Sequence, residues 1–114
     1  MSYVFECGDQ TVWSPALRVG KLYVTLAEAL AAMLSVPSGL SAMASDYYQM
    51  DRDQFTACGA ALRDWVPGAH AAGDALLGGF LTTSLVLMQR TGAVLEVDDE
   101  TGAAVAALAA SMAV

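Results

Sequence analysis

Residues 70–90, HAAGDALLGGFLTTSLVLMQR, constrain the fold of this chain more than any other segment. On a helix, the bulky apolar side chains of this segment would cover most of the circumference: Leu76, Leu77, Phe80, Leu81, Leu85, Val86, Leu87 and Met88. A helix that is apolar nearly all round is normally buried on several sides. Gly78 and Gly79 within it favour close packing or a kink. We therefore expect either the central core helix or the contact surface of a homodimer.

Three other segments show helical periodicity. An amphipathic helix over about 15–35 is predicted to start with Ser14 as N-cap and Pro15 in the first helical position. The residues expected on its apolar, inward side recur at helical spacing: Val19, Leu22, Tyr23, Leu26, Leu30, Met33 and Leu34. A second helix, over about 52–66, follows Asp51 and Gln54, whose spacing resembles a capping box. A last helix is expected to begin after Asp98 or Asp99.

Two short β-rich stretches, 3–7 and 93–97, are predicted to pair as a two-stranded ribbon against the helices. A chain of 114 residues fits one domain, 1–114, and is long enough to bury a core without disulfides or metal. The expected fold class is mostly α, a four-helix bundle-like single domain that carries this small ribbon.

The composition points to self-association. Hydrophobic residues make up 56% of the chain and charged residues only 15%, where about a quarter is usual for the charged fraction. A monomer of this size would have difficulty hiding so much apolar surface. We therefore expect a homodimer formed through the 70–90 helix.

The charges exclude two classes of partner. The net charge is −7, and the five bases are scattered along the chain. Nucleic acids and anionic membrane surfaces both require concentrated positive charge, so neither is an expected partner.

The start has no signal-peptide pattern, and the apolar runs fall short of the ~20 residues that cross a bilayer, so we expect a cytoplasmic protein. Cys7 and Cys58 are expected to be reduced, packed thiols.

The segment SDYYQMDRDQ, residues 45–54, is a polar island in an apolar chain. Asp46 and Asp51 could form a carboxylate pair beside Tyr47 or Tyr48, a set suited to proton transfer with a carbonyl or hydroxyl substrate. The alternative is structural: Asp51 caps the next helix, Asp46 forms an Asx turn, and one tyrosine packs while the other faces water.

His70, the only histidine, has Asp74 four residues later, so the two could orient an imidazole for base catalysis or supply two metal ligands. The alternative is an exposed histidine near a helix start, where Asp74 is favoured by the helix dipole. No zinc motif completes the pair, and the acids of the island lack the spacing of a calcium loop. We expect neither a metal nor a cofactor.

Several large side chains suit an apolar ligand. Trp13, Tyr23, Trp65 and Phe80 could line such a pocket, because flat aromatic faces adapt to apolar shapes. In a chain this apolar, the same residues could equally form the core or an interface.

Two stretches, YVFECGDQTVWSPALRVGKLYV and VPSGLSAMASDYYQMD, carry a family resemblance. They resemble a group of small actinomycete proteins of unknown function in which a VW-x-P helix start precedes a PxGL-x-x-MA-x-D stretch. The likeness runs over about residues 3–55. It implies that the island belongs to the family pattern, and it implies no activity.

For function, we expect a small non-catalytic helical protein that binds a protein partner or an apolar small molecule. The composition implies interfaces, and no motif implies chemistry. The alternative is a cofactor-independent enzyme or a carrier acting on an apolar metabolite. Asp46, Tyr47, Tyr48, Asp51 and His70 would then be its polar groups; secondary metabolism as the setting is implied by the resemblance alone.

Overall fold

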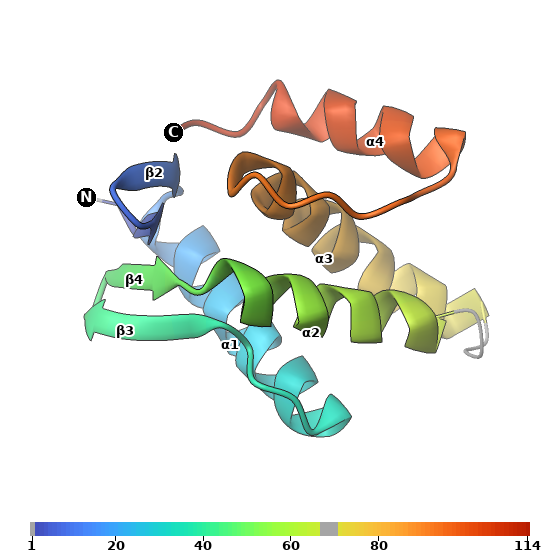
Figure 1. The fold of residues 1–114 in the computed structure, drawn as a ribbon, viewed down its shortest axis with the longest axis horizontal. Helices are drawn as coiled ribbons and strands as arrows, with labels where there is room; N and C mark the ends of the chain where they lie inside the picture. The colour runs from blue at the N-terminus through green and yellow to red at the C-terminus, as the bar shows by residue number, and fades with distance from the viewer. Residues whose placement is uncertain (1, 67–70) are drawn as a thin grey trace.

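The computed structural model describes residues 2–66 and 71–114, and these form an α+β domain (Figure 1). In chain order the elements are β1 (Val4–Cys7), β2 (Gln10–Trp13), α1 (Leu17–Leu34), β3 (Leu40–Ala44), β4 (Tyr47–Met50), α2 (Arg52–Trp65), α3 (Ala71–Arg90) and α4 (Asp99–Ala109). The expectation of a mostly α four-helix bundle is therefore wrong. The four helices are present, but three of them pack on a four-stranded sheet.

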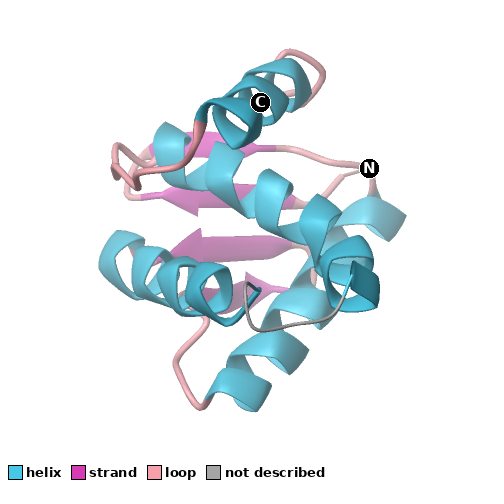
Figure 2. Cartoon of the chain, turned by 90° about the vertical axis from the view of Figure 1, so that its right-hand side faces the viewer, coloured by secondary structure: helices cyan, strands magenta, loops and turns pink. Residues whose placement is uncertain are grey.

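The sheet is mixed, with the strand order β2-β1-β4-β3. Each outer pair is an antiparallel hairpin, and the two hairpins join through parallel pairing of β1 with β4. Helix α1 connects the hairpins, as the crossover between parallel strands requires. Figure 2 shows the helices gathered on one face of the sheet, with α4 packed on α3, so within the described residues the other face of the sheet is bare.

The predicted ribbon between 3–7 and 93–97 is wrong. Strand β1 does form, but it pairs with β2 and β4. Residues 93–97 belong to no strand in the described chain and run as an extended connection to α4. Within the polar island, Tyr47–Met50 is an inner strand of the sheet, which the sequence did not predict.

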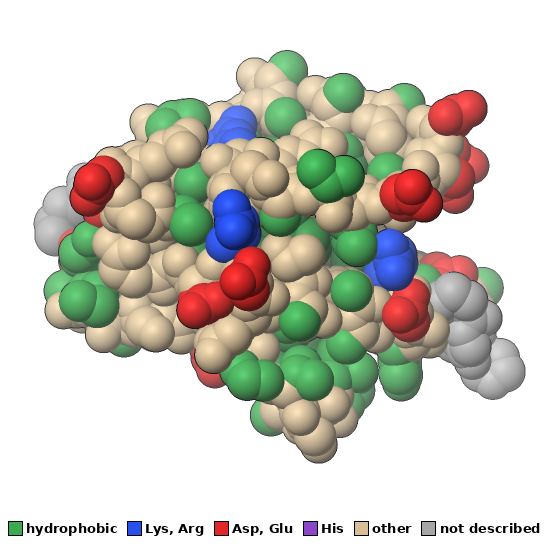
Figure 3. Space-filling model, viewed as in Figure 1, with side chains coloured by type: hydrophobic (Ala, Val, Ile, Leu, Met, Phe, Trp, Pro, Cys, Tyr) green, Lys and Arg blue, Asp and Glu red, His purple; other side chains and the backbone are tan. Residues whose placement is uncertain are grey.

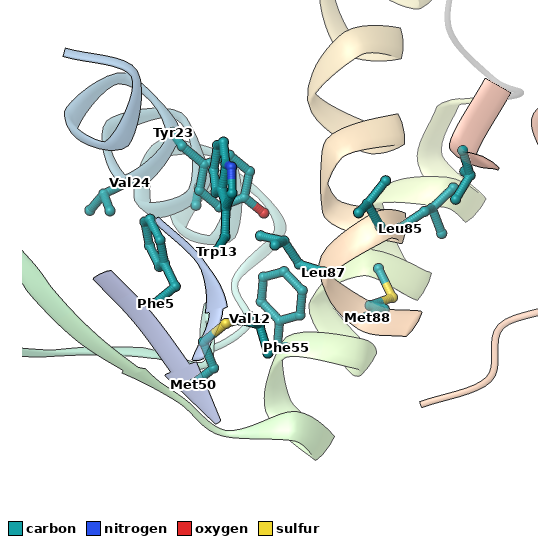
Figure 4. Close-up of a cluster of buried hydrophobic side chains, with 13 residues drawn as sticks. Phe5, Val12, Trp13, Tyr23, Val24, Met50, Phe55, Leu85, Leu87 and Met88 are labelled. Carbon is teal, nitrogen blue, oxygen red and sulfur yellow. The ribbon is translucent and has the colours of Figure 1, made fainter. Parts of the chain in front are cut away.

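The core lies between the sheet and the helices (Figure 4). Its largest fully buried side chains are Phe5, Val12, Leu62, Val86, Leu87, Met88 and Val105. The C-terminal half of α3 is buried throughout Ser84–Met88, as a central helix should be, whereas Ala71, Ala72 and Asp74–Leu76 are exposed. By length and composition alone α3 could also cross a membrane, with 28% of that window buried in the domain.

The helix starts agree with the sequence at two places. The Asp51 carboxylate accepts the Gln54 N–H at 2.9 Å, and the Asp98 carboxylate accepts the Thr101 N–H at 2.7 Å. The latter bond lowers the pKa of Asp98. Both aspartates are therefore N-caps.

The predicted start of α1 is wrong. The helix begins at Leu17, after Ala16, and no side chain caps it. The reason lies in the backbone before it: Ser14 N–H donates to the Ala113 carbonyl, and the Pro15 carbonyl accepts the Tyr3 N–H. Residues 14 and 15 are thus held as extended chain beside the two termini.

Arg90 ties three distant segments together. Its guanidinium donates to the carbonyls of Val12 at 2.8 Å, Ala109 at 3.1 Å and Met112 at 2.9 Å. These oxygens belong to β2, the end of α4 and the C-terminal segment. Hydrogen bonds to a charged donor are stronger than neutral ones, so this half-buried side chain ties the end of α4 and the C-terminal segment to β2.

We predict that Arg90→Met lowers the free energy of unfolding by about 2 kcal/mol, because it leaves three carbonyls without their charged donor. Urea denaturation measures this change. Arg52→Met is the matched control, since the exposed Arg52 pairs only with the exposed Asp53 at 3.5 Å, and it should cost less than about 0.5 kcal/mol. Equal losses in the two variants would contradict the assigned role of Arg90.

Candidate functional site: an apolar groove between α1 and α3

The adjacent tyrosines of the island face opposite sides of the sheet, because side chains alternate along a strand. Tyr47 lies on the bare face, where its hydroxyl donates to Glu6 Oε1 at 2.7 Å. Gln49 Nε2 donates to the Tyr47 hydroxyl at 2.7 Å, and Thr11 donates to Glu6 Oε2 at 3.2 Å. The bond to the Glu6 carboxylate raises the pKa of Tyr47.

Tyr48 lies on the helix-covered face. Its ring stacks on Tyr3 at 6.0 Å and on Phe5 at 5.9 Å between centroids, and burial raises its pKa. Asp46 occupies the β3–β4 turn, and its carbonyl accepts the Val4 N–H at 2.8 Å.

The structure therefore does not assemble the island into one site. Tyr47 and Tyr48 are separated by the sheet, and the Asp51 carboxylate is used to cap α2. His70 lies outside the described residues. Among those residues, no cluster of histidine, cysteine and acidic side chains could hold a metal ion.

Three of the four predicted ligand-binding residues do come together. Trp13 and Tyr23 meet edge to face with centroids 5.5 Å apart, and Tyr23 stacks on Phe80 at 5.0 Å. They line a groove of about 320 Å³ between α1 and α3, together with Val19, Leu22, Leu26, Leu76, Gly79 and Thr83. Trp65, in the last turn of α2, is not among the residues that line this groove.

A buried hydrogen bond fixes the floor of the groove. The Tyr23 and Ser84 hydroxyl oxygens lie 2.7 Å apart. Ser84 donates to the Phe80 carbonyl at 3.0 Å, so the Tyr23 hydroxyl is the donor to Ser84. Burial holds the pKa of Tyr23 well above its ordinary value.

The side chains at the rims of the groove are exposed to solvent. Leu22 on α1 is 59% exposed, and Leu76 on α3 is 82% exposed. The sequence suggested that Val19, Leu22 and Leu26 pack inward with Tyr23, but the core takes Tyr23, Val24, Ala27 and Ala31 instead. Figure 3 shows hydrophobic side chains also gathering where the C-terminal half of α1 emerges below α2.

The described lining of the groove has no free acid–base group. Tyr23 is the only titratable residue in its lining, and its hydroxyl is bonded to Ser84. The Thr83 hydroxyl donates to the Gly79 carbonyl at 2.9 Å. The accessible lining of the groove is therefore aliphatic and aromatic.

Fold and groove together define a small α+β domain with the helices on one side of its sheet and an open apolar groove between α1 and α3. The chain belongs to the family of unknown function DUF6086, whose model matches residues 1–114. The expected membership of an uncharacterised family is thus confirmed and extends over the whole chain. No curated protein and no solved structure matches it.

The rim residues Leu22, Leu26 and Leu76 were not among the predicted site residues, and neither was Arg90. The rim residues carried a signal, since they are large and apolar, but they were assigned to the core or to a homodimer contact. Nothing in the sequence shows which carbonyls Arg90 reaches, because its partners lie 19 to 78 residues away.

We predict that Tyr23→Phe and Ser84→Ala are coupled by about 1 kcal/mol in a double-mutant cycle measured by urea denaturation, because each removes the same buried hydrogen bond. Thr82→Ala paired with Tyr23→Phe is the control, since the Thr82 hydroxyl bonds only within its own helix, to Gly78. A coupling near zero for the Tyr23–Ser84 pair would contradict the assigned bond.

Alkaline stability should depend on Tyr23. Its folded-state pKa is raised above the unfolded value of 10.0, so this contribution is fully present below pH 10. Above that pH the unfolded chain ionises first, and the free energy of unfolding should fall by about 1.4 kcal/mol per pH unit from this residue. Tyr23→Phe should remove this part of the decline in denaturation measured from pH 9 to pH 11. If the free energy of unfolding fell equally with pH in the two proteins, the assigned role of Tyr23 would be contradicted.

Proposed function

We propose that this protein is a non-catalytic interaction protein that docks an apolar protein surface in the α1–α3 groove. The observation that carries the proposal is the pairing of exposed aliphatic rims with an aromatic floor. Exposed apolar side chains that line a continuous depression favour a binding partner over solvent.

The surface area of the domain supports this proposal. The accessible surface is 6439 Å², whereas a compact monomer of 11.8 kDa should expose about 5,900 Å². The radius of gyration, 13.3 Å, equals the value of about 13 Å expected for this length. The extra area therefore does not come from elongation, and it supports a surface that carries open hollows.

The openness of the groove favours a protein over a small molecule. A small-molecule site usually encloses most of its ligand's surface. Here Leu22 and Leu76 project into water, so a ligand lying between them would keep much of its surface exposed. A carrier of an apolar metabolite is the second candidate, because the stacked Tyr23 and Phe80 rings form a flat apolar floor.

Adjacent glycines provide a matched test. Gly78 and Gly79 both lie in α3, and a Cβ at either position would meet nothing within 4 Å. Only Gly79 lines the groove. Gly79→Leu should therefore fill the groove, and Gly78→Leu should leave it open, while leucine raises helix stability at both positions by up to about 1 kcal/mol.

The probe is anilinonaphthalene sulfonate, titrated into 1 µM protein in a Trp65→Phe background so that Trp13 is the only tryptophan. We expect energy transfer from Trp13 to the bound dye. Gly78→Leu should change the affinity for the dye little, and Gly79→Leu should weaken it at least about tenfold. Equal dye binding by the two leucine variants would reject the groove as the docking site. Tight, saturable binding of small apolar metabolites at this site would instead support the carrier.

A further inference from the structure

Helix α1 presents an exposed apolar seam that its own domain does not use. The seam consists of Val19, Leu22, Leu26, Ala29 and Met33, which recur at alternating intervals of three and four residues. All five are exposed, and the four large side chains range from 40% for Leu26 to 59% for Leu22. This spacing is the a/d pattern of a helix that packs along a second helix.

The seam and the groove are continuous. Val19, Leu22 and Leu26 are also one wall of the groove, and Leu76 and Gly79 of α3 are the opposite wall. A helix laid along the seam would therefore also cover the groove. Gly78 and Gly79, with open space where a side chain would stand, let a second backbone approach α3 closely.

We propose that the partner at this groove is a second copy of this chain, whose α1 packs antiparallel along α1 and over the exposed half of α3. This inference rests on the proposed docking function of the groove, and it names the partner. A twofold axis near Leu26 places Val19 against Met33 of the partner subunit. The seam spans about 21 Å, from 14 residues at 1.5 Å each.

Charge selects the antiparallel direction. The only bases of α1, Arg18 and Lys21, are in its first turns, and its last turn holds none. A parallel pair would bring these cations together. An antiparallel pair sets them beside the C-terminal carbonyls of the other α1, where the helix dipole is negative.

Charge also favours this face for contact between two copies. Each chain carries a net charge of −7, so two chains repel over most of their surfaces. The α1 surface holds two of the five bases and one acid, Glu28. The Ser38 hydroxyl donates to the Glu28 carboxylate at 2.7 Å, so this acid is already hydrogen-bonded. Electrostatic repulsion between two copies is therefore low at this face.

Sedimentation tests the association. At 100 µM the natural chain should sediment with twice its monomer mass of 11.8 kDa, and at 1 µM, the concentration of the dye titration, it should dissociate and leave the groove open. Leu26→Asp, at the centre of the seam, should weaken association at least about 30-fold. The control is Val94→Asp, an 88% exposed side chain outside the seam, which should leave the dimer intact. A monomer at all concentrations, or equal effects of the two aspartates, would overturn the proposal.

Cysteine cross-linking tests the direction. Under mild oxidation Leu26→Cys should link to itself, whereas Val19→Cys should link only when mixed with Met33→Cys. The natural chain, with Cys7 and Cys58, is the blank. Self-linking of Val19→Cys would show a parallel pair and would overturn the antiparallel assignment.

The two proposals can fail separately. A monomeric natural chain that still distinguishes Gly79→Leu from Gly78→Leu in dye binding would retain the docking groove and reject the second copy as its occupant. Loss of that dye contrast, together with a dimer that Leu26→Asp does not disrupt, would reject the groove itself.

Discussion

The packing of the Phe5 ring is the contact on which the rest of this fold depends. β1 is an inner strand, and its Phe5 is fully buried. The centroid of the Phe5 ring lies 5.6 Å from that of Trp13 of β2, 5.9 Å from that of Tyr48 of β4 and 5.9 Å from that of Tyr23 of α1. One side chain thus joins both hairpins and the helix between them. Aromatic rings bury large areas and also prefer particular orientations, so this cluster determines the position of α1 on the sheet as well as its attachment.

The groove is a consequence of that placement. With Tyr23 packed against Phe5, the buried side of α1 consists of Tyr23, Val24, Ala27 and Ala31. Leu22 and Leu26 therefore face solvent. α3 meets α1 at the Tyr23–Ser84 hydrogen bond, and the groove lies beside this contact. The chain therefore leaves large apolar side chains in water at one place, which is the condition for a docking surface.

Sequence reasoning succeeded where structure is local. The extents of the four helices follow from apolar periodicity, and Asp51 and Asp98 start their helices as capping chemistry requires. It failed for the sheet, because three of its four strands are only four residues long. The fourth strand, β3, has the sequence LSAMA, in which three of five side chains are small and most residues are exposed. The pairing of Val4 with Tyr47 joins residues 43 positions apart, and no local pattern specifies such a partner. The same limit explains why Tyr47 and Tyr48, adjacent in sequence, could be placed together in one hypothetical site that the sheet divides.

The sequence by itself determined where helices form, which carboxylates cap two of them, and that the chain carries more apolar surface than one small domain readily buries. These properties depend on neighbours within about four residues or on composition alone. Only the tertiary structure decided that the strands form a mixed sheet with one bare face, and which apolar side of α1 is buried. That helix carries apolar side chains over a wide arc, from Val19, Leu22 and Leu26 to Tyr23, Val24 and Ala27, so its own sequence does not choose which side is buried. The choice is made by aromatic contacts between Tyr23 and residues of distant strands, and it leaves Val19, Leu22 and Leu26 exposed.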